Sequence, residues 1–298
     1  MKSKQNQNHY PLFYLFIIIL FFACNVKHEK KVEEIKKLNP STTNPAIQPA
    51  KIDSQKKEQS IESSIQHFIP IVTDTSKKYI YLTFDDGPQH GTVACFDLCK
   101  KLGIKSTFFM VGLHASSPNL RNIVKEIKEN YPQTLLANHS LSHANNKYHS
   151  FYHHEYSAMA DLFLAQKVLK VPFNIIRLPG SNSWVIDDKI KAEPLALPVC
   201  KLMDSCGYNI LGWDLEWHFN HTNANPVQSA DKMVEYVYSK FAKEKLLTKN
   251  HLVILTHDRM FRNPNYADSL SKFISILQKD TNYIFETVDH YPRLKAIK

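Results

Sequence analysis

Residues 79–88 read YIYLTFDDGP, and this stretch decides the fold. Its first six residues are mostly apolar and do not alternate with charged positions. Such a continuous run is typical of a strand buried on both faces, as in a parallel sheet covered by helices. The run ends at Asp85 and Asp86, and the following Gly87-Pro88 predicts a turn. The stretch therefore predicts a central parallel strand with two carboxylates at its C-terminal end.

The rest of the chain alternates strand-like and helix-like segments. The expected strands are short and rich in Ile, Val, Leu, Phe and Tyr: Tyr79–Phe84, Thr107–Val111, Thr134–Ala137, Phe173–Ile176, Asn209–Trp213, Leu252–Thr256 and Tyr283–Val288. Helical patterns lie between them at Thr92–Leu102, Asn119–Asn130, Glu155–Leu169, Ala230–Lys245 and Asp268–Lys279. This alternation indicates an α/β fold with a parallel sheet, open or closed. We expect a distorted, incomplete (β/α) barrel of about seven parallel strands over residues 78–298.

Two histidines follow another expected strand at a spacing suited to a metal ion. His139 and His143 are four residues apart, so on a helical turn both imidazoles would project to one side. Two histidines and one carboxylate, with a fourth position open, are a usual ligand set of catalytic zinc. Three further histidines are interpreted as part of a solvated segment: His149, His153 and His154.

Other expected strands also end in polar or aromatic side chains, namely Arg177, Trp213 with Asp214, and His257. Each of these has an ordinary explanation when taken alone, as a surface charge, a core ring or a silent histidine. The two aspartates likewise have an ordinary explanation as an acidic turn. In parallel barrels, however, the C-terminal ends of the strands meet on the face where active sites are built. Together the strand ends predict a catalytic site.

Five motifs in order along the chain carry a resemblance to a known family. They are Thr-Phe-Asp-Asp-Gly-Pro, His-Ser-x-x-His, Arg-x-Pro, Trp-Asp and Leu-x-His. This ordered set resembles the polysaccharide deacetylase family, the NodB-homology domain of carbohydrate esterases, over about residues 78–290. The resemblance implies a distorted (β/α) barrel that removes N- or O-acetyl groups from glycans with one divalent metal, most often Zn²⁺.

The resemblance also implies roles for the matching positions. Asp86, His139 and His143 would hold the metal. Asp85 would be the general base and His257 the general acid.

Further matching positions would support these groups or contact substrate. Arg177 would orient the base, and Asp214 would hold an ionic network around Arg177 or the acid. Leu255 and one tryptophan, Trp213 or Trp217, would wall an acetyl-methyl pocket, and Pro179 and Gly180 would also contact substrate.

The chain departs from the family pattern in two places. Gly180 follows Arg-x-Pro, where the family usually has an aromatic residue. Its backbone N–H can still stabilise an oxyanion, but the groove wall loses a ring. The segment from Trp213 to Trp217 is compressed and lacks the family's later Asp-Trp pair. We therefore expect the hydrolytic chemistry to be retained. The departures leave the identity of the substrate undetermined or altered.

The N-terminus has the pattern of an export signal. Lys2 and Lys4 precede an apolar run that ends at Ala23, and Cys24 follows. Because Phe21-Phe22-Ala23-Cys24 resembles a lipobox, we expect a lipoprotein signal over residues 1–24 and a membrane anchor through lipid on Cys24. The alternative is an ordinary signal peptide with an incidental cysteine.

Residues 25–77 are expected to be a disordered tether. Residues 25–67 contain no aromatic residue and no glycine, and Lys, Glu, Gln, Ser and Pro dominate them. Such a composition cannot bury enough apolar surface to offset the entropy of ordering.

Composition excludes several classes of protein. The 43% hydrophobic content excludes a fully disordered chain, and the N-terminal apolar run is shorter than the roughly 20 residues of a membrane-spanning helix. The net charge of +9 suits anionic surroundings. The charges are spread along the chain with no nucleic-acid signature, so we expect no nucleic-acid partner.

The leading interpretation is an exported hydrolase of carbon–nitrogen bonds other than peptide bonds. It would remove N-acetyl groups from peptidoglycan or an N-acetylglucosamine polymer while facing the periplasm or exterior. The alternatives are an O-acetyl esterase on acetylated glycan, a hydrolase of a small amide, and a catalytically silent glycan-binding lipoprotein. The complete set of proposed base, acid and metal ligands argues against the binding protein, which needs neither base nor acid. The sequence leaves the polymer, the metal and the oligomeric state open.

Overall fold

The computed structural model describes residues 74–295. The expected signal sequence, Cys24 and the tether up to residue 73 lie outside the described residues. Between residues 74 and 295, none of the helices has the length and hydrophobicity needed to cross a membrane.

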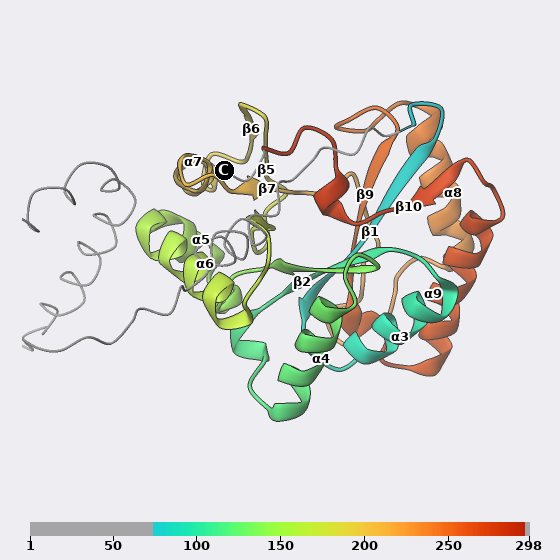
Figure 1. Ribbon diagram of the computed structural model, residues 1–298, viewed down its shortest axis with the longest axis horizontal. Coiled ribbons are helices and arrows are strands. Elements are labelled where there is room, and N and C mark those ends of the chain that lie inside the picture. The colour runs from blue at the N-terminus through green and yellow to red at the C-terminus, as the bar shows by residue number, and fades with distance from the viewer. Residues whose placement is uncertain (1–73, 296–298) are drawn as a thin grey trace, which may run out of the picture. The chain divides into compact units, whose positions relative to one another are not determined.

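The described residues form one curled sheet with helices packed against it (Figure 1). Its strands are β1 (Lys78–Gly87), β2 (Ser106–Met110), β3 (Thr134–Asn138), β4 (Ile175–Ile176), β5 (Trp184–Ile186), β6 (Lys189–Lys191), β7 (Asn209–Ile210), β8 (Leu215–Glu216), β9 (His251–His257) and β10 (Tyr283–Phe285). They lie in the order β6-β5-β7-β4-β3-β2-β1-β9-β8, and β10 pairs with the beginning of β1. Within the described range the two ends of this order do not pair, so the barrel is incomplete, as expected from the sequence.

Most neighbouring strands are parallel, and the exceptions were not expected. β5 pairs antiparallel with β6 and with β7, which adds a short hairpin to one edge of the sheet. β8 was also missed, because two residues are too few to give a periodic pattern.

The α-helices are α3 (Thr92–Leu102), α4 (Pro118–Glu129), α5 (Tyr148–His153), α6 (Glu155–Leu169), α7 (Leu197–Ser205), α8 (Ala230–Ala242) and α9 (Pro264–Gln278). Short 3₁₀ turns are η1 (Gly112–His114), η2 (His143–Asn146), η3 (Asp258–Phe261) and η4 (Val288–His290). The bounds of α3 and α6 match the sequence-based prediction, whereas α5 and α7 were not anticipated.

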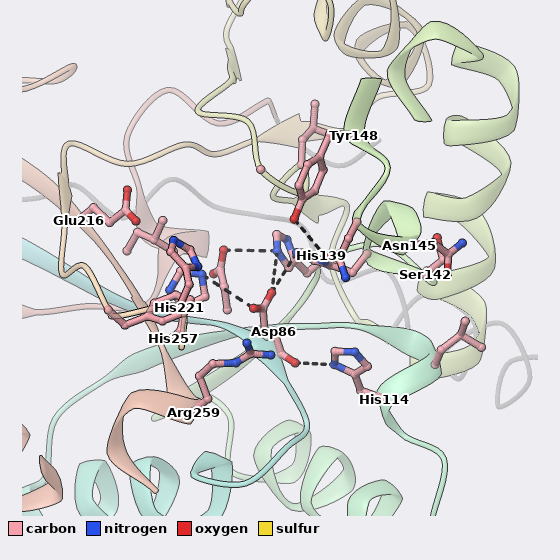
Figure 2. Close-up of a pocket in the computed structure, with 18 of the residues that line it drawn as sticks. Asp86, His114, His139, Ser142, Asn145, Tyr148, Glu216, His221, His257 and Arg259 are labelled. Atoms are coloured by element: carbon pink, nitrogen blue, oxygen red, sulfur yellow. Dashed lines mark hydrogen bonds and ion pairs between the residues drawn. The ribbon is translucent and has the colours of Figure 1, made fainter. Parts of the chain in front are cut away.

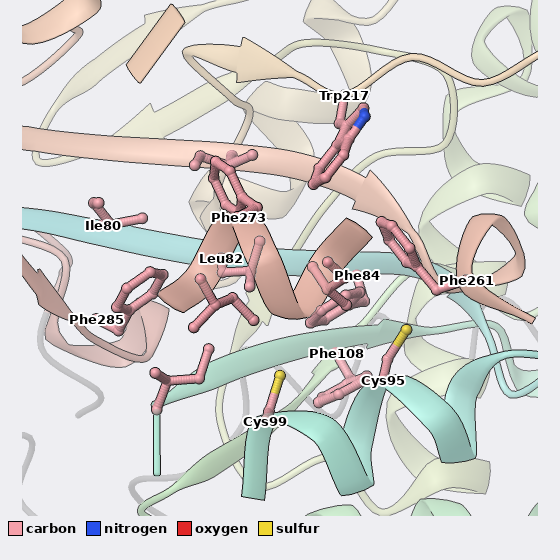
Figure 3. Close-up of a cluster of buried hydrophobic side chains, with 14 of the residues drawn as sticks. Ile80, Leu82, Phe84, Cys95, Cys99, Phe108, Trp217, Phe261, Phe273 and Phe285 are labelled. Atoms are coloured by element: carbon pink, nitrogen blue, oxygen red, sulfur yellow. The ribbon is translucent and has the colours of Figure 1, made fainter. Parts of the chain in front are cut away.

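β1 is buried on both faces, as its continuous apolar run predicts. Leu82 and Phe84 point into a core shared with α3, where Cys95 and Cys99 are also buried (Figure 3). Tyr81 belongs to a second core on the opposite face. Because both faces are packed, the strand is held rigidly and its carboxyl end is a firm base for a site.

Candidate active site

The carboxyl end of β1 contains a bulge at its two aspartates. The register of β1 against β2 shifts between Asp85 and Gly87, and Asp86 has a φ of 72°. Adjacent side chains of a regular strand point to opposite faces, but a bulge re-aims one of them. The His114 Nδ1–H donates to the Asp86 carbonyl oxygen at 2.6 Å and so fixes the bulge. As a result, both carboxylates line one cavity of about 740 Å³ (Figure 2).

His139 and His143 reach the same cavity from the segment after β3. The His139 Nδ1–H donates to the Arg177 carbonyl oxygen at 2.8 Å, which leaves Nε2 facing Asp86. The helical turn expected from the i, i+4 spacing is not formed, because Ser140 and His143 have φ values of 73° and 50°. A turn with positive φ brings the two rings to 5.1 Å between centroids instead.

These three side chains form an open ligand set. Asp86 Oδ1 lies 3.0 Å from His143 Nε2 and 3.5 Å from His139 Nε2, yet it is buried without a hydrogen-bond partner. One potential ligand atom from each residue lies within 4.8 Å of the others. Burial raises the pKa of Asp86, but the two imidazoles outweigh it and hold that pKa well below its usual range. A carboxylate oxygen and two imidazole nitrogens that approach without bonding one another suit a divalent cation.

Asp85 is held by a buried guanidinium. Arg177 Nη1 donates to Asp85 Oδ1 at 2.8 Å and to Thr83 Oγ1 at 2.6 Å. The remaining Arg177 donors bind two backbone carbonyls, and its guanidinium lies 4.2 Å from the centre of the Phe109 ring. With Oδ1 fixed in this way, Asp85 Oδ2 is left at the cavity, 3.6 Å from His139 Nε2.

His257 ends β9, directly beside Asp85 in the strand register. Its Nε2 lies 4.0 Å from Asp86 Oδ2, and its ring stands edge-on against Phe219 at 4.8 Å. Burial lowers the pKa of His257, and the charges of Asp86 and Asp85 offset only part of this effect. The structure thus brings the Asp85 carboxylate and the His257 imidazole next to the open ligand set.

Comparisons with known proteins agree with this geometry. The family model described as polysaccharide deacetylase matches residues 73–193, which include Asp85, Asp86, His139, His143 and Arg177. Over these residues the chain matches the polysaccharide deacetylase family.

Similar proteins include two curated deacetylases. Chitin disaccharide deacetylase of Vibrio alginolyticus is 21% identical over 322 residues, covering 78% of this chain and 75% of the relative. Peptidoglycan-N-acetylglucosamine deacetylase of Bacillus cereus is 25% identical over 231 residues, covering 72% of each chain.

A solved structure also has the same architecture. The catalytic domain of peptidoglycan N-acetylglucosamine deacetylase from Eubacterium rectale superposes with a TM-score of 0.52 at 26% identity, over 72% of this chain and 90% of that one. This deacetylase is therefore an enzyme of the α/β, incomplete-barrel type expected from its sequence.

The cavity wall contains three of the residues expected there, Leu255, Trp213 and Gly180. A ring that the sequence analysis missed covers Gly180: a Cβ at this position would lie 3.0 Å from Tyr148 Cε1. Tyr148 also lines the cavity and packs edge-on against His143. The ring lacking at position 180 is thus supplied by the first residue of α5.

Two residues expected at the site, Trp217 and Pro179, are buried and do not line the cavity. Trp217 is fully buried against Phe261 and Phe273, and its indole N–H donates to a backbone carbonyl. Pro179 does not line the cavity, and its carbonyl oxygen accepts from the Tyr152 hydroxyl.

The expected network around Asp214 was also wrong. Both Asp214 carboxylate oxygens accept backbone N–H groups, from Leu247 at 2.8 Å and Val253 at 2.9 Å. The sequence pattern predicted that Asp214 directly follows a strand that ends at Trp213. In the structure β7 ends at Ile210, and Asp214 lies just before β8. It therefore ties a loop to β9, and it forms no hydrogen bond or ion pair with Arg177 or His257.

Sequence reasoning missed further residues of the cavity because they lie outside the five sequence motifs. They are Leu113, His114, Tyr148, Phe219, His221 and Arg259. The only available signal was position, since Arg259 comes two residues after His257 and Tyr148 five residues after His143.

Proposed function

We propose that this polysaccharide deacetylase is a zinc-dependent N-deacetylase of an N-acetylglucosamine-containing envelope polymer. The observation that carries the proposal is the open set of Asp86, His139 and His143, flanked by Asp85 and His257 at the base of a cavity. Two relatives support the amide substrate by name, one as a chitin disaccharide deacetylase and one as a peptidoglycan-N-acetylglucosamine deacetylase.

Zinc suits the donor set, and a bound ion would supply a Lewis acid for the acetyl carbonyl and a water of lowered pKa. The chain's own residues divide the proton transfers. Asp85 Oδ2 takes the proton of the attacking water while Arg177 fixes Oδ1. The water oxygen bonds to the acetyl carbon, and the oxyanion formed receives a hydrogen bond from the Gly180 N–H.

His257 completes the reaction as the general acid. It donates a proton to the glucosamine nitrogen as the carbon–nitrogen bond breaks, which releases acetate and leaves a free amine. Leu255 and Trp213 enclose the acetyl methyl group in an apolar wall, which excludes water from the reacting carbon.

The proposed place of action is the cell envelope. The apolar run before Cys24 and its lipobox-like ending support export and lipid attachment. The expected tether would then hold the enzyme away from the membrane and within reach of polymer.

Acetate release tests this proposal. The full chain is incubated with N-acetylglucosamine tetramer and separately with acetylated xylan, with added zinc or with chelator, and acetate is measured by mass spectrometry. Zinc-dependent release from the tetramer is expected. Release from xylan alone would establish an O-acetyl esterase, and release from neither, with zinc bound, would favour the glycan-binding protein.

A further inference from the structure

Arg259 lies on the boundary between two hollows of the surface. The catalytic cavity of about 740 Å³ and a groove of about 880 Å³ share three lining residues, Leu113, His114 and Arg259. The groove continues over the beginnings of α3 and α4, where Val93 and Leu113 expose apolar side chains. A chain of sugars deacetylated in the cavity would therefore extend across Arg259 into this groove.

The Arg259 side chain is held in place by neutral partners. Its Nε donates to Gln89 Oε1 at 3.2 Å, and its guanidinium lies 5.8 Å from the centre of the Phe219 ring. Gln89 is oriented in turn, because its Nε2 donates to Asp258 Oδ1 at 2.6 Å and Asp258 is fully buried. This chain of contacts fixes Nε and leaves the two terminal nitrogens of the guanidinium for another partner.

Among the described residues Arg259 forms no ion pair, and the carboxylates that line the cavity with it are those of Asp85, Asp86 and Glu216. Two other arginines show the contrast, since Arg177 pairs with Asp85 and Arg293 pairs with Asp187. The groove itself has no aspartate or glutamate among its described lining residues, while its basic side chains are His90, His114, Arg259 and Arg262. Arg262 donates only to backbone carbonyl oxygens, of Arg259 and Asn223. The groove is therefore positive and lacks a counter-charge of its own.

We propose that this groove binds a carboxylate on the sugar next to the one being deacetylated, with Arg259 as its main ligand. The natural substrate would then be an acidic N-acetylated glycan rather than a neutral one. A planar guanidinium with two free terminal nitrogens matches the geometry of a carboxylate, and such charge-assisted pairs are stronger than neutral hydrogen bonds. The inference rests on the proposed N-deacetylase function and adds the charge of the substrate to it.

Matched glycans test the groove with the full zinc-loaded chain. The acidic substrate is a tetrasaccharide of alternating N-acetylglucosamine and N-acetylmuramic acid, and its matched partner is the same compound with both lactyl carboxylates as methyl esters. N-acetylglucosamine tetramer serves as a neutral substrate, and an alternating N-acetylglucosamine–glucuronate tetramer carries the carboxylate from a different source. Preference between the two acidic tetramers identifies which position of the carboxylate the groove accepts.

We expect wild-type kcat/KM to be about tenfold or more higher for an acidic tetramer than for the methyl ester. Arg259→Gln should lose this preference through KM, so that its kcat/KM falls by a larger factor on the acidic tetramers than on the ester and the neutral tetramer. Arg259→Lys, which keeps the charge, should restore part of it. Lys101→Gln is the charge-matched control, because Lys101 is exposed at the far end of α3 and should leave every ratio unchanged.

Two results would overturn the inference while leaving the proposed function intact. One is equal wild-type activity on both acidic tetramers and on the ester, and the other is an equal loss on all substrates in Arg259→Gln. If no substrate is turned over, the proposed function fails, and calorimetry with the same glycans still decides the groove. Tighter wild-type binding of an acidic tetramer than of the ester, abolished in Arg259→Gln, would support it, and equal binding would contradict it.

Discussion

Two clusters of buried carboxylates and histidines lie in this deacetylase, and their hydrogen bonding is opposite. In the cluster of Glu286, His290 and Lys105, Glu286 Oε1 accepts from His290 Nδ1 at 2.8 Å and Glu286 Oε2 from Lys105 Nζ at 2.9 Å. In the catalytic cavity, Asp86 Oδ1 has imidazole nitrogens at 3.0 and 3.5 Å and bonds neither.

The difference separates a structural network from a ligand set. A buried carboxylate whose oxygens all receive hydrogen bonds has satisfied its desolvation cost within the chain. A buried carboxylate that faces two imidazoles without hydrogen-bonding them still carries its desolvation cost. A cation bound between the three groups would offset that cost. The two clusters contain similar residue types. They differ in whether the carboxylate oxygens receive hydrogen bonds from the neighbouring nitrogens.

The largest loss of activity is expected when one of the three proposed metal ligands is removed. His139→Ala should lower kcat/KM for N-acetylglucosamine tetramer by about a thousandfold or more, because Lewis-acid assistance contributes several kcal/mol. Steady-state acetate release measures it. His149→Ala, on the exposed face of α5, is the matched control and should keep wild-type activity.

The next effect separates base from ligand within the same cavity. Asp85→Asn should lower kcat by about 10²- to 10⁴-fold while bound zinc stays at the wild-type ratio, since it removes a proton acceptor and no ligand. Turnover and metal analysis of the same preparation provide the check. Loss of zinc with recovery of activity after reconstitution would reverse the roles given to Asp85 and Asp86.

A smaller effect is expected where Tyr148 covers Gly180. Gly180→Ala adds a Cβ 3.0 Å from the Tyr148 ring at a φ of 62°, so it should lower kcat/KM in the wild type. In the Tyr148→Ala background only the backbone strain remains, and the same substitution should cost less. A double-mutant cycle should give a coupling of about 0.5–1.5 kcal/mol. Strict additivity of the two substitutions would show that the ring does not form the wall over Gly180.

The smallest effect on activity is expected from substitutions in the cluster of Glu286, His290 and Lys105. These substitutions should change the stability of the fold instead. Burial raises the pKa of Glu286, but hydrogen bonds from His290 and Lys105 outweigh it and lower that pKa to about 2. The folded pKa lies below the ordinary 4.5, so this stabilisation is complete above about pH 4.5 and is lost as pH falls toward about 2. Burial lowers the pKa of His290, but Glu286 and Asp289 outweigh it and raise that pKa, so its contribution is complete below pH 6.5 and is lost as pH rises through the raised value.

Glu286→Gln should therefore lower the free energy of unfolding by about 2 kcal/mol at pH 5.5 and by much less at pH 2.5. Urea unfolding at the two pH values measures this difference. Zinc content and acetate release should remain at the wild-type level, and a loss of zinc would contradict the distinction between the clusters.

The sequence predicted those parts of the molecule that depend on local pattern. The continuous run before Asp85 identified a strand buried on both faces, and the ordered motifs identified the cluster of Asp86, His139 and His143. Contacts between distant segments escaped it, because no local pattern encodes them. The Tyr148 ring reaches Gly180 from a segment interpreted as solvated, and Asp214 was misplaced because β7 is shorter than its apolar run.

Zinc stoichiometry shows directly whether Asp86, His139 and His143 form a metal site. The metal-stripped full chain is titrated with zinc and examined by native mass spectrometry, alongside Asp86→Ala and Glu286→Gln. We expect one tightly bound ion per chain in the wild type and in Glu286→Gln, and none in Asp86→Ala. An ion retained by Asp86→Ala, or none bound by the wild type, would contradict it.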